Sequence, residues 1–303
     1  MSQSHKEQSS LSKSLNEHLE ENPELKDQLR NMALGVNPET EEENPNFDYD
    51  SELPKVSILI PTYNRRNFLT LMLININNMD YPKDKLEVVI FDDHKINPLF
   101  DSQATAKMMF NKMGVELNYI YEPKRHLSIG EKRNKLVKLA KHKICINMDD
   151  DDIYFPTYVR YSVDLLIKNK AGLVGSPEMF FTFPHHDYEV SAIKCKAKRQ
   201  IHEATMCFTK KHWRSMGGFD KQGVGEGSKM VDFNEKSCVM SDINKCMCCV
   251  VHQNNTVDKE QFRGSNKDVV DLVIPDIYKH LLDNIIGGIQ YDNKREPEIK
   301  DDY

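Results

Sequence analysis

Long hydrophobic runs are absent from this chain of 303 residues. Apolar segments such as Leu71–Ile76 are far shorter than the ~20 residues that a helix needs to cross a bilayer. The polar amino terminus also lacks the hydrophobic core of a signal peptide. We therefore expect a soluble, cytoplasmic protein with no membrane insertion.

An excess of positive charge is absent too. Lys and Arg number 41 against 47 Asp and Glu, which gives a net charge of −6. Residues 1–50 hold 12 acids and 4 bases, so residues 51–303 hold 35 acids and 37 bases. Nucleic-acid-binding proteins usually carry a basic patch, so this balance argues against a nucleic acid partner.

The cysteines do not form an evident set of disulfide pairs. There are seven, an odd number, and without a secretion signal we expect reduced thiols. Cys246 and Cys249 have the spacing of half a zinc site, with His252 nearby, but such a site needs a second pair. We expect instead a short buried strand, Cys246–Val251, whose cysteines fill apolar space.

Composition divides the chain into three parts. Residues 1–50 are acidic and poor in aromatics, which predicts an extension that is mostly disordered or helical. Leucines from Leu11 to Leu29 recur near helical spacing, so this segment is a candidate for self-association. Residues 51–290 alternate strand and helix patterns and predict one domain, and residues 291–303 form a charged tail.

The chain does contain four consecutive aspartates, Asp149–Asp152, directly after the apolar run Ile144–Met148. This pattern predicts a buried strand whose carboxyl end opens into a polar site. In an extended chain Asp149 and Asp151 project to one side, and paired carboxylates suit Mg²⁺ or Mn²⁺. Four carboxylates this close repel one another, so a cation or basic neighbours are required.

Other strand and helix patterns surround this run. Two further apolar strands end in polar residues: Val56–Ile60 before Pro61–Arg65, and Leu86–Phe91 before Asp92 and Asp93. We expect a helix over Phe68–Ile76 with Asn64 as its cap, and a helix that begins at Ser128, where Glu131 completes a capping box. Further helices are expected after Pro156 and over Asp276–Ile286, and a hairpin from Met179–Phe183 and Tyr188–Ile193. Strands that alternate with helices predict an open α/β sheet with its ligands at the carboxyl ends of the strands.

Five segments then carry a resemblance to a known family: Val56–Arg65, Val88–Asp93, Gly130–Asn134, Asn147–Asp152 and Gly217–Asp220. In order and spacing they resemble a family 2 glycosyltransferase with the GT-A fold. The pair Asp149 and Asp151 looks like the DxD motif of that family. The resemblance implies a Rossmann-like, mostly parallel central sheet flanked by helices, with a smaller β-rich acceptor part.

The resemblance also implies the site residues. Asp151 is the first choice as direct ligand of Mn²⁺ or Mg²⁺, Asp149 holds the ribose or a metal-bound water, and Asp152 is either a second ligand or an orienting acid. His252 resembles a late histidine that some members supply as a metal ligand, although a surface histidine at a strand end is the alternative. The donor nucleotide is expected at Pro61, Thr62, Tyr63, Arg65, Asp92, Asp93, Lys132, Arg133, Asp149 and Asp150.

The catalytic base is expected after Gly217–Asp220, where inverting members carry a pair of acids. Here Glu226 matches the first acid, but Gly227 replaces the second. A glutamate between glycines can lie on a loop next to substrate, where desolvation raises its pKa. We expect Glu226 as the base, with Asp232 and Asp220 as rivals. Trp213 is expected either to stack on an acceptor sugar or to pack on the sheet.

The function that these residues imply is metal-dependent transfer of a sugar from a nucleoside-diphosphate sugar, UDP by preference, to an acceptor hydroxyl with inversion. The acceptor is a glycan or a protein. One alternative is a sugar nucleotidyltransferase, but the Gly-rich basic loop of that class is missing after the first strand. Another is a non-catalytic carbohydrate-binding or assembly protein with the same fold.

Overall fold

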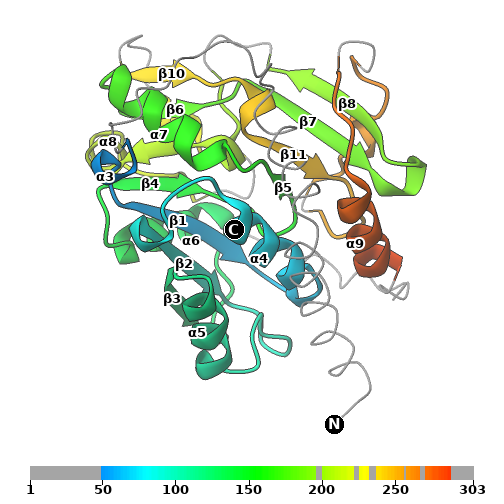
Figure 1. Ribbon diagram of the computed structural model, residues 1–303, viewed down its shortest axis with the longest axis horizontal. Coiled ribbons are helices and arrows are strands. Elements are labelled where there is room, and N and C mark those ends of the chain that lie inside the picture. Colours follow the sequence, from blue (N-terminus) through cyan, green and yellow to red (C-terminus); the bar gives the residue numbers. More distant parts are fainter. Residues whose placement is uncertain are drawn as a thin grey trace, which may run out of the picture.

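The computed structural model describes residues 49–195, 200–221, 225–231, 237–255, 257–266 and 270–287. Most of the expected N-terminal extension and the charged tail lie outside these residues. The described chain forms a large sheet and a smaller one, with helices on both faces of the large sheet (Figure 1).

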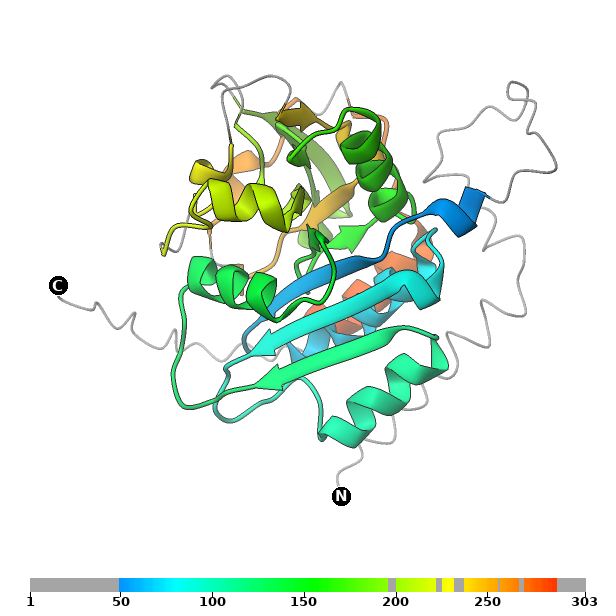
Figure 2. The ribbon, with the colours of Figure 1, turned by 90° about the vertical axis from the view of Figure 1, so that its left-hand side faces the viewer.

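The large sheet has seven strands in the order β10-β6-β9-β4-β1-β2-β3. Their bounds are β1 (Val56–Thr62), β2 (Leu86–Asp92), β3 (Glu116–Tyr121), β4 (Ile144–Asn147), β6 (Leu173–Gly175), β9 (Cys207–Thr209) and β10 (Cys238–Met240). β1 to β4 pair in parallel, and β9 alone runs antiparallel to its neighbours. Figure 2 shows β1, β2 and β3 side by side with their arrowheads at one edge. The expected mostly parallel α/β sheet is confirmed.

Side chains alternate between the two faces of β1, so each face takes its own helices. Ile58 and Ile60 belong to a core shared with α4 (Leu69–Asn78), α5 (Gln103–Lys112) and α7 (Tyr158–Lys168). Leu59 belongs to a second core, with α6 (Ile129–Leu139) and α8 (Lys210–Ser215). In Figure 1, α4 and α5 lie in front of the sheet. A short helix, α3 (Tyr49–Glu52), precedes β1.

The smaller sheet has the order β5-β11-β7-β8. Its strands are β5 (Ile153–Tyr154), β7 (Glu178–Phe183), β8 (Glu189–Lys194) and β11 (Met247–Val250). The antiparallel pair β7–β8 confirms the expected hairpin. The last described helix, α9 (Asp276–Gly287), contacts this hairpin, because the Tyr188 hydroxyl hydrogen-bonds to Asp283 at 2.6 Å.

Two further expectations concern caps and cysteines. Ser128 and Glu131 form the expected capping box at the start of α6. Asn64 is not a helix cap: it has φ +54°, and a 3-10 turn begins at Arg66 without a side-chain cap. All seven cysteines are free thiols, and Cys248 and Cys249 are buried in β11 as expected.

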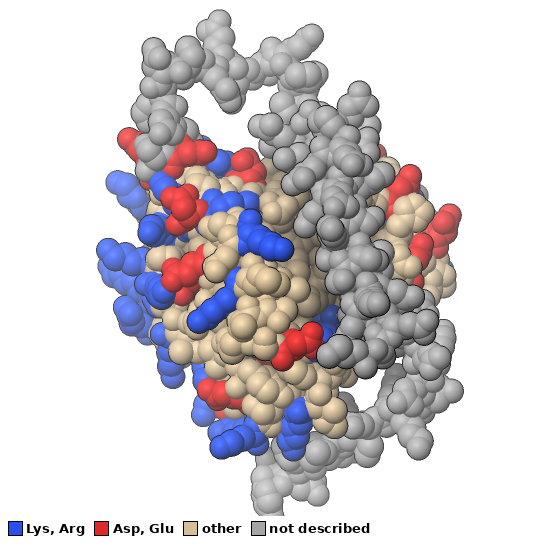
Figure 3. All heavy atoms as spheres, turned by 60° about the horizontal axis from the view of Figure 1, so that its bottom comes forward, with Lys and Arg blue, Asp and Glu red and all other residues tan. Residues whose placement is uncertain are grey.

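Charge on the surface is mixed. Figure 3 shows basic side chains gathered along one margin of the face that it presents, with acidic side chains among them. Within the described part of the chain, no helix is both long and apolar enough to cross a membrane.

Candidate active site

The carboxyl ends of three parallel strands bring the predicted residues to one edge of the sheet. Thr62 at the end of β1 lies opposite Asp92 at the end of β2, and Asp149–Asp152 follow β4 on the other side of β1. The first turns of α6 lie over this edge, because the Lys132 ammonium donates to the Thr62 carbonyl at 3.1 Å. The expected site is therefore assembled from elements far apart in sequence.

Basic groups surround the aspartates, as their mutual repulsion requires. Arg65 Nε lies 3.2 Å from Asp151 Oδ2 and 3.9 Å from Asp150 Oδ1. His252 Nε2 lies 3.0 Å from the same Asp151 oxygen. Burial alone raises the pKa of the Asp151 carboxyl, but Arg65 and His252 outweigh it and hold this pKa well below its usual range. At Asp150 the balance is reversed: burial and the Asp151 charge outweigh Arg65 and raise the pKa of this carboxyl.

Asp152 faces a lysine that the sequence did not single out. Its Oδ1 accepts from the Val250 amide at 3.0 Å, which ties the aspartate run to β11. Burial raises the Asp152 pKa to about 7, against the opposing charge of Lys259. Lys259 Nζ lies 2.7 Å from Cys249 Sγ. Asp152 therefore links the large sheet to the smaller one.

The predicted metal ligands have different surroundings. The described residues contain no group of three His, Cys, Asp or Glu side chains placed to hold a metal. Asp151 and His252 do lie together, and their 3.0 Å separation suits two ligands about 2.1 Å from one ion at a right angle. Asp149, which is expected to hold the ribose or a metal-bound water, is paired with Arg133 at 3.1 Å. The residues fit Mn²⁺ or Mg²⁺ as a partial shell completed by water and phosphate oxygens.

Arg133 joins the aspartates to the predicted base. Its Nη2 donates to Asp149 Oδ1 at 3.1 Å and its Nε to Glu226 Oε1 at 2.9 Å. Its side chain is 3% exposed, and Nη1 has no hydrogen-bond partner among the described residues. A buried guanidinium with a free donor can receive an anion such as a phosphate.

Glu226 is buried against the start of α6. Burial raises its pKa, against the charge of Arg133. The Asp220 amide donates to the Glu226 carbonyl at 2.8 Å, which closes the loop that carries both residues. Asp220 itself pairs with Lys229. A Cβ at Gly130 would lie 1.6 Å from the Asp220 carbonyl oxygen, so only glycine lets this loop approach α6. Asp232, the rival base, lies outside the described residues.

The two acids after β2 have different surroundings. Asp92 accepts from the His94 and Leu99 amides at 3.1 and 2.8 Å and from the Tyr119 hydroxyl at 3.0 Å, so it fixes the following loop. Asp93 lies 2.5 Å from Lys132 Nζ and accepts from the Leu127 amide at 2.7 Å. The Asp93–Lys132 pair thus lies over the strand ends, where the donor nucleotide is expected, whereas Asp92 holds the loop in place.

Tyr63 carries an aromatic surface beside this pair. The residue is 39% exposed, and its ring contacts the rings of His94 and His126, with centroids 4.7 and 4.2 Å away. Lys132 Nζ lies 5.1 Å from the centre of the same ring. Pro61 is buried within β1, so its side chain belongs to the sheet. Neither histidine was singled out from the sequence, because isolated loop histidines have no pattern.

Asn134 is a further residue with a defined role. Its side chain donates to the Phe219 carbonyl at 2.7 Å and accepts from the Phe219 amide at 2.9 Å and the Trp213 indole at 2.9 Å. These bonds anchor the Gly217–Asp220 segment on α6. A signal was present, because Asn134 ends one of the five family-like segments.

Comparisons with known proteins bear on the family and the fold. The model of the family "Glycosyl transferase family 2" matches residues 57–227. The UDP-forming cellulose synthase catalytic subunit of Pseudomonas fluorescens is 26% identical over 133 residues, 43% of this chain and 17% of that protein. The poly(ribitol-phosphate) β-N-acetylglucosaminyltransferase TarS of Staphylococcus aureus (strain Mu50) is 29% identical over 98 residues, 32% of this chain and 16% of that protein. The chain therefore spans less than a fifth of these relatives.

A solved structure shares the fold. The 1–349 fragment of S. aureus TarS in complex with UDP-GlcNAc aligns with a TM-score of 0.50 at 14% identity, over 76% of this chain and 65% of that one. At this identity the likeness concerns the fold alone. It matches the GT-A arrangement that the resemblance implied.

Proposed function

Because the chain belongs to glycosyl transferase family 2, we propose that it transfers a sugar from a nucleoside-diphosphate sugar to an acceptor hydroxyl, with inversion. The observation that carries the proposal is the position of Arg133, which spans Asp149 and Glu226 at the carboxyl edge of the sheet. One arginine thus connects the side where a donor diphosphate would lie to the acid that would activate an acceptor.

The donor is assigned to the side of the site that carries Tyr63. The exposed Tyr63 ring offers a stacking surface for a base, and the buried Asp93–Lys132 pair lies beside it. Arg133 Nη1 and Lys132 provide positive charge for the diphosphate. UDP is the preferred nucleotide, which the UDP-forming relative supports.

Mn²⁺ or Mg²⁺ would be held by Asp151 and His252, and it would supply positive charge to the leaving diphosphate. Arg65 pairs with Asp151 in the present arrangement, so it must give up this contact when a cation binds. Its Nη2 also bonds the Asn254 carbonyl, which gives the displaced guanidinium a neighbouring anchor.

Glu226 is assigned the role of base. The acceptor oxygen forms its bond to the anomeric carbon from the face opposite the diphosphate, while the bond from that carbon to the diphosphate oxygen breaks. The hydroxyl proton passes to Glu226, and the electron pair of the broken bond leaves on the diphosphate. Burial raises the pKa of Glu226, which makes it a stronger base than an exposed glutamate.

Binding tests the donor site directly. Calorimetric titration of UDP, GDP and dTDP, with and without Mn²⁺, should show one nucleotide that binds more tightly with the ion. Asp151→Ala should lose this gain, whereas Asp101→Ala, which removes an exposed acid, should keep it. If no nucleotide binds under either condition, the donor site is refuted and the non-catalytic alternative is favoured.

A further inference from the structure

A groove runs along the outer side of α6, away from the face that packs on the sheet. It has a volume of about 660 Å³ and is lined by Glu131, Asn134, Lys135 and Lys138 of α6, by Trp213 and Arg214 of α8, and by Leu127, Gly217, Gly218 and Lys221. This α6–α8 groove takes no part in the donor site described above. Its volume falls within the range of small-ligand sites, about 300–1,000 Å³.

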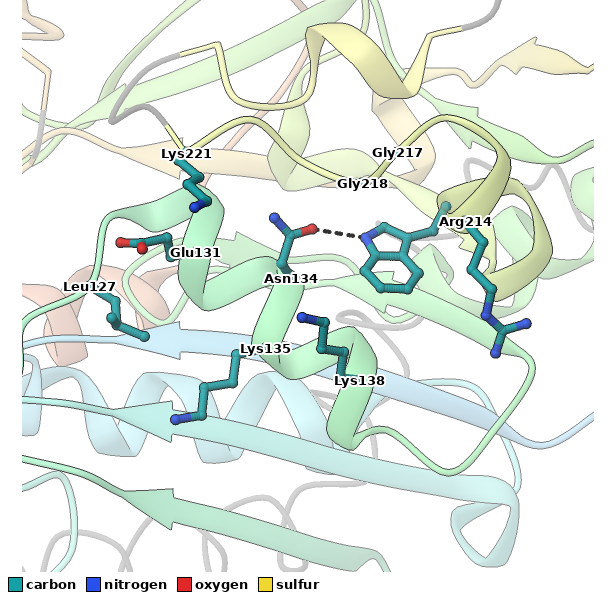
Figure 4. A pocket seen from close by; sticks show the side chains of 10 residues that line it. Leu127, Glu131, Asn134, Lys135, Lys138, Arg214, Gly217, Gly218 and Lys221 are labelled. Atoms are coloured by element: carbon teal, nitrogen blue, oxygen red, sulfur yellow. Dashed lines mark hydrogen bonds between the residues drawn. The ribbon is translucent and has the colours of Figure 1, made fainter.

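Its aromatic wall is held in a fixed orientation. The Trp213 indole N–H donates to Asn134 Oδ1, and Figure 4 draws this bond as the dashed line at Asn134. That hydrogen bond is 2.9 Å long. Gly218 completes the wall at φ +79°, and a Cβ there would lie 2.6 Å from Asn134 Oδ1 and 2.9 Å from Trp213 Nε1. Because this ring already has a fixed orientation, it loses little conformational entropy when a ligand binds.

The remaining walls are basic. Lys135, Lys138, Arg214 and Lys221 face one acid, Glu131, whose carboxylate is engaged by the capping box and by Arg125. Lys135 pairs with Glu122 outside the groove. Lys138, Arg214 and Lys221 have no acidic partner among the residues that the structure describes. The groove thus carries uncompensated positive charge beside an aromatic surface.

We infer that the α6–α8 groove binds an anionic saccharide, a chain of sugar units that bears phosphate or carboxylate groups. A sugar ring has an apolar face that packs on an indole, and the anionic groups are matched by the lysines and Arg214. A nucleic acid is the weaker fit, because a single aromatic residue offers no succession of stacking surfaces for bases.

The groove and the proposed catalytic site share helix α6. Asn134 and Arg133 are neighbours on α6, and Asn134 anchors the segment that continues to Asp220 and Glu226. An anionic saccharide in the groove would therefore lie along the element that carries the Arg133–Glu226 pair. The anionic saccharide would then be the acceptor or a part of the acceptor. This assignment rests on the proposed function.

The chain offers a direct reporter, because Trp213 is its single tryptophan. We would titrate oligogalacturonate, dextran phosphate and neutral dextran while recording tryptophan fluorescence, with oligodeoxythymidine as a further arm. The two anionic saccharides should change the emission with an affinity that falls as salt rises. The variant Lys138→Glu/Arg214→Glu should weaken that affinity at least tenfold. Lys107→Glu/Lys112→Glu, which reverses two exposed charges on α5, should leave it unchanged.

The outcomes separate the groove from the transferase proposal. The inference is overturned if neither anionic saccharide changes the fluorescence. It is also overturned if neutral dextran binds equally well or oligodeoxythymidine binds more tightly. The Lys138→Glu/Arg214→Glu variant should retain the melting temperature and donor hydrolysis of the parent. If the groove binds anionic saccharide but the protein neither binds nor hydrolyses any donor, the groove stands and the transferase fails.

Discussion

The Arg133 guanidinium lies 2.9 Å from the Glu226 carboxylate, and both side chains are almost fully buried. Arg133 also holds Asp149, so a single cation balances two acids on different segments. When a donor diphosphate draws on this arginine, Glu226 loses part of its neutralisation. In the proposed mechanism, this geometry would couple occupation of the donor site to the basicity of Glu226.

Replacement of Arg133 should affect both stability and activity. Arg133→Ala leaves the buried Glu226 carboxylate and the partly exposed Asp149 carboxylate without their cation, which costs about 3–5 kcal/mol in the free energy of unfolding. Arg133→Lys keeps the charge but cannot span both acids, so we expect an intermediate loss. Urea unfolding and nucleotide-sugar hydrolysis measure the two effects. Arg125→Ala, which removes an exposed pair with Glu131, is the control, and an equal loss there would refute the account.

Glu226→Gln should separate chemistry from donor binding. Loss of a general base slows the chemical step by about 10²–10⁴-fold, while nucleotide affinity should stay within a few-fold of the parent. In the parent, the transfer rate should rise with pH, because Glu226 acts only when deprotonated. Its raised pKa places this rise above the ordinary range of a glutamate. A parent profile that stays flat down to pH 4 would exclude Glu226 as the base.

His202 should make the protein acid-sensitive. Burial lowers the pKa of His202 from 6.5 to about 4, and the ring contacts Cys195 Sγ at 3.2 Å. The unfolded chain binds this proton more readily, so stability is present above pH 6.5 and is lost as pH falls toward 4. The loss amounts to about 3 kcal/mol.

Unfolding curves at several pH values test this dependence. His202→Gln should show a shallower decline between pH 6.5 and 4 than the parent. His185→Gln, at an exposed histidine, should keep the full decline. Parallel curves for the parent and His202→Gln would show that His202 is not the group responsible.

Gly130→Ala should be harmful although it lies in a helix. Alanine normally stabilises a helix by about 1 kcal/mol relative to glycine. Here its Cβ would collide with the Asp220 carbonyl oxygen at 1.6 Å. We therefore expect a lower melting temperature and a displaced Glu226 loop, with reduced transfer. A melting temperature equal to or above that of the parent would contradict this contact.

The sequence predicts those parts of the site that follow from the pattern of apolar residues and from local helix caps. The apolar runs before Asp92 and Asp149 fix the strands, parallel pairing brings their ends together, and the Ser128 capping box places α6. The alternation of side chains also indicates that Asp92 and Asp93 face opposite ways. It does not tell which acid reaches the site, because that depends on the loop that Asp92 binds.

Contacts between distant side chains could not be predicted from the sequence. Three contacts depend on the lengths of the intervening loops: Arg65 with Asp151, Lys259 near Asp152, and Arg133 with Asp149 and Glu226. Asn64 was assigned to a cap by its preference for that position, yet the backbone there takes a left-handed conformation. Tertiary contacts outweigh such local preferences, which amount to about 1 kcal/mol.

The most direct test is release of nucleoside diphosphate from UDP-, GDP- and dTDP-sugars incubated with the protein and Mn²⁺, without acceptor. We predict slow hydrolysis of one donor class, abolished in Asp151→Ala and retained in Asp101→Ala. No release from any donor, or the same release in Asp151→Ala as in the parent, would contradict the assignment of this site to glycosyl transfer.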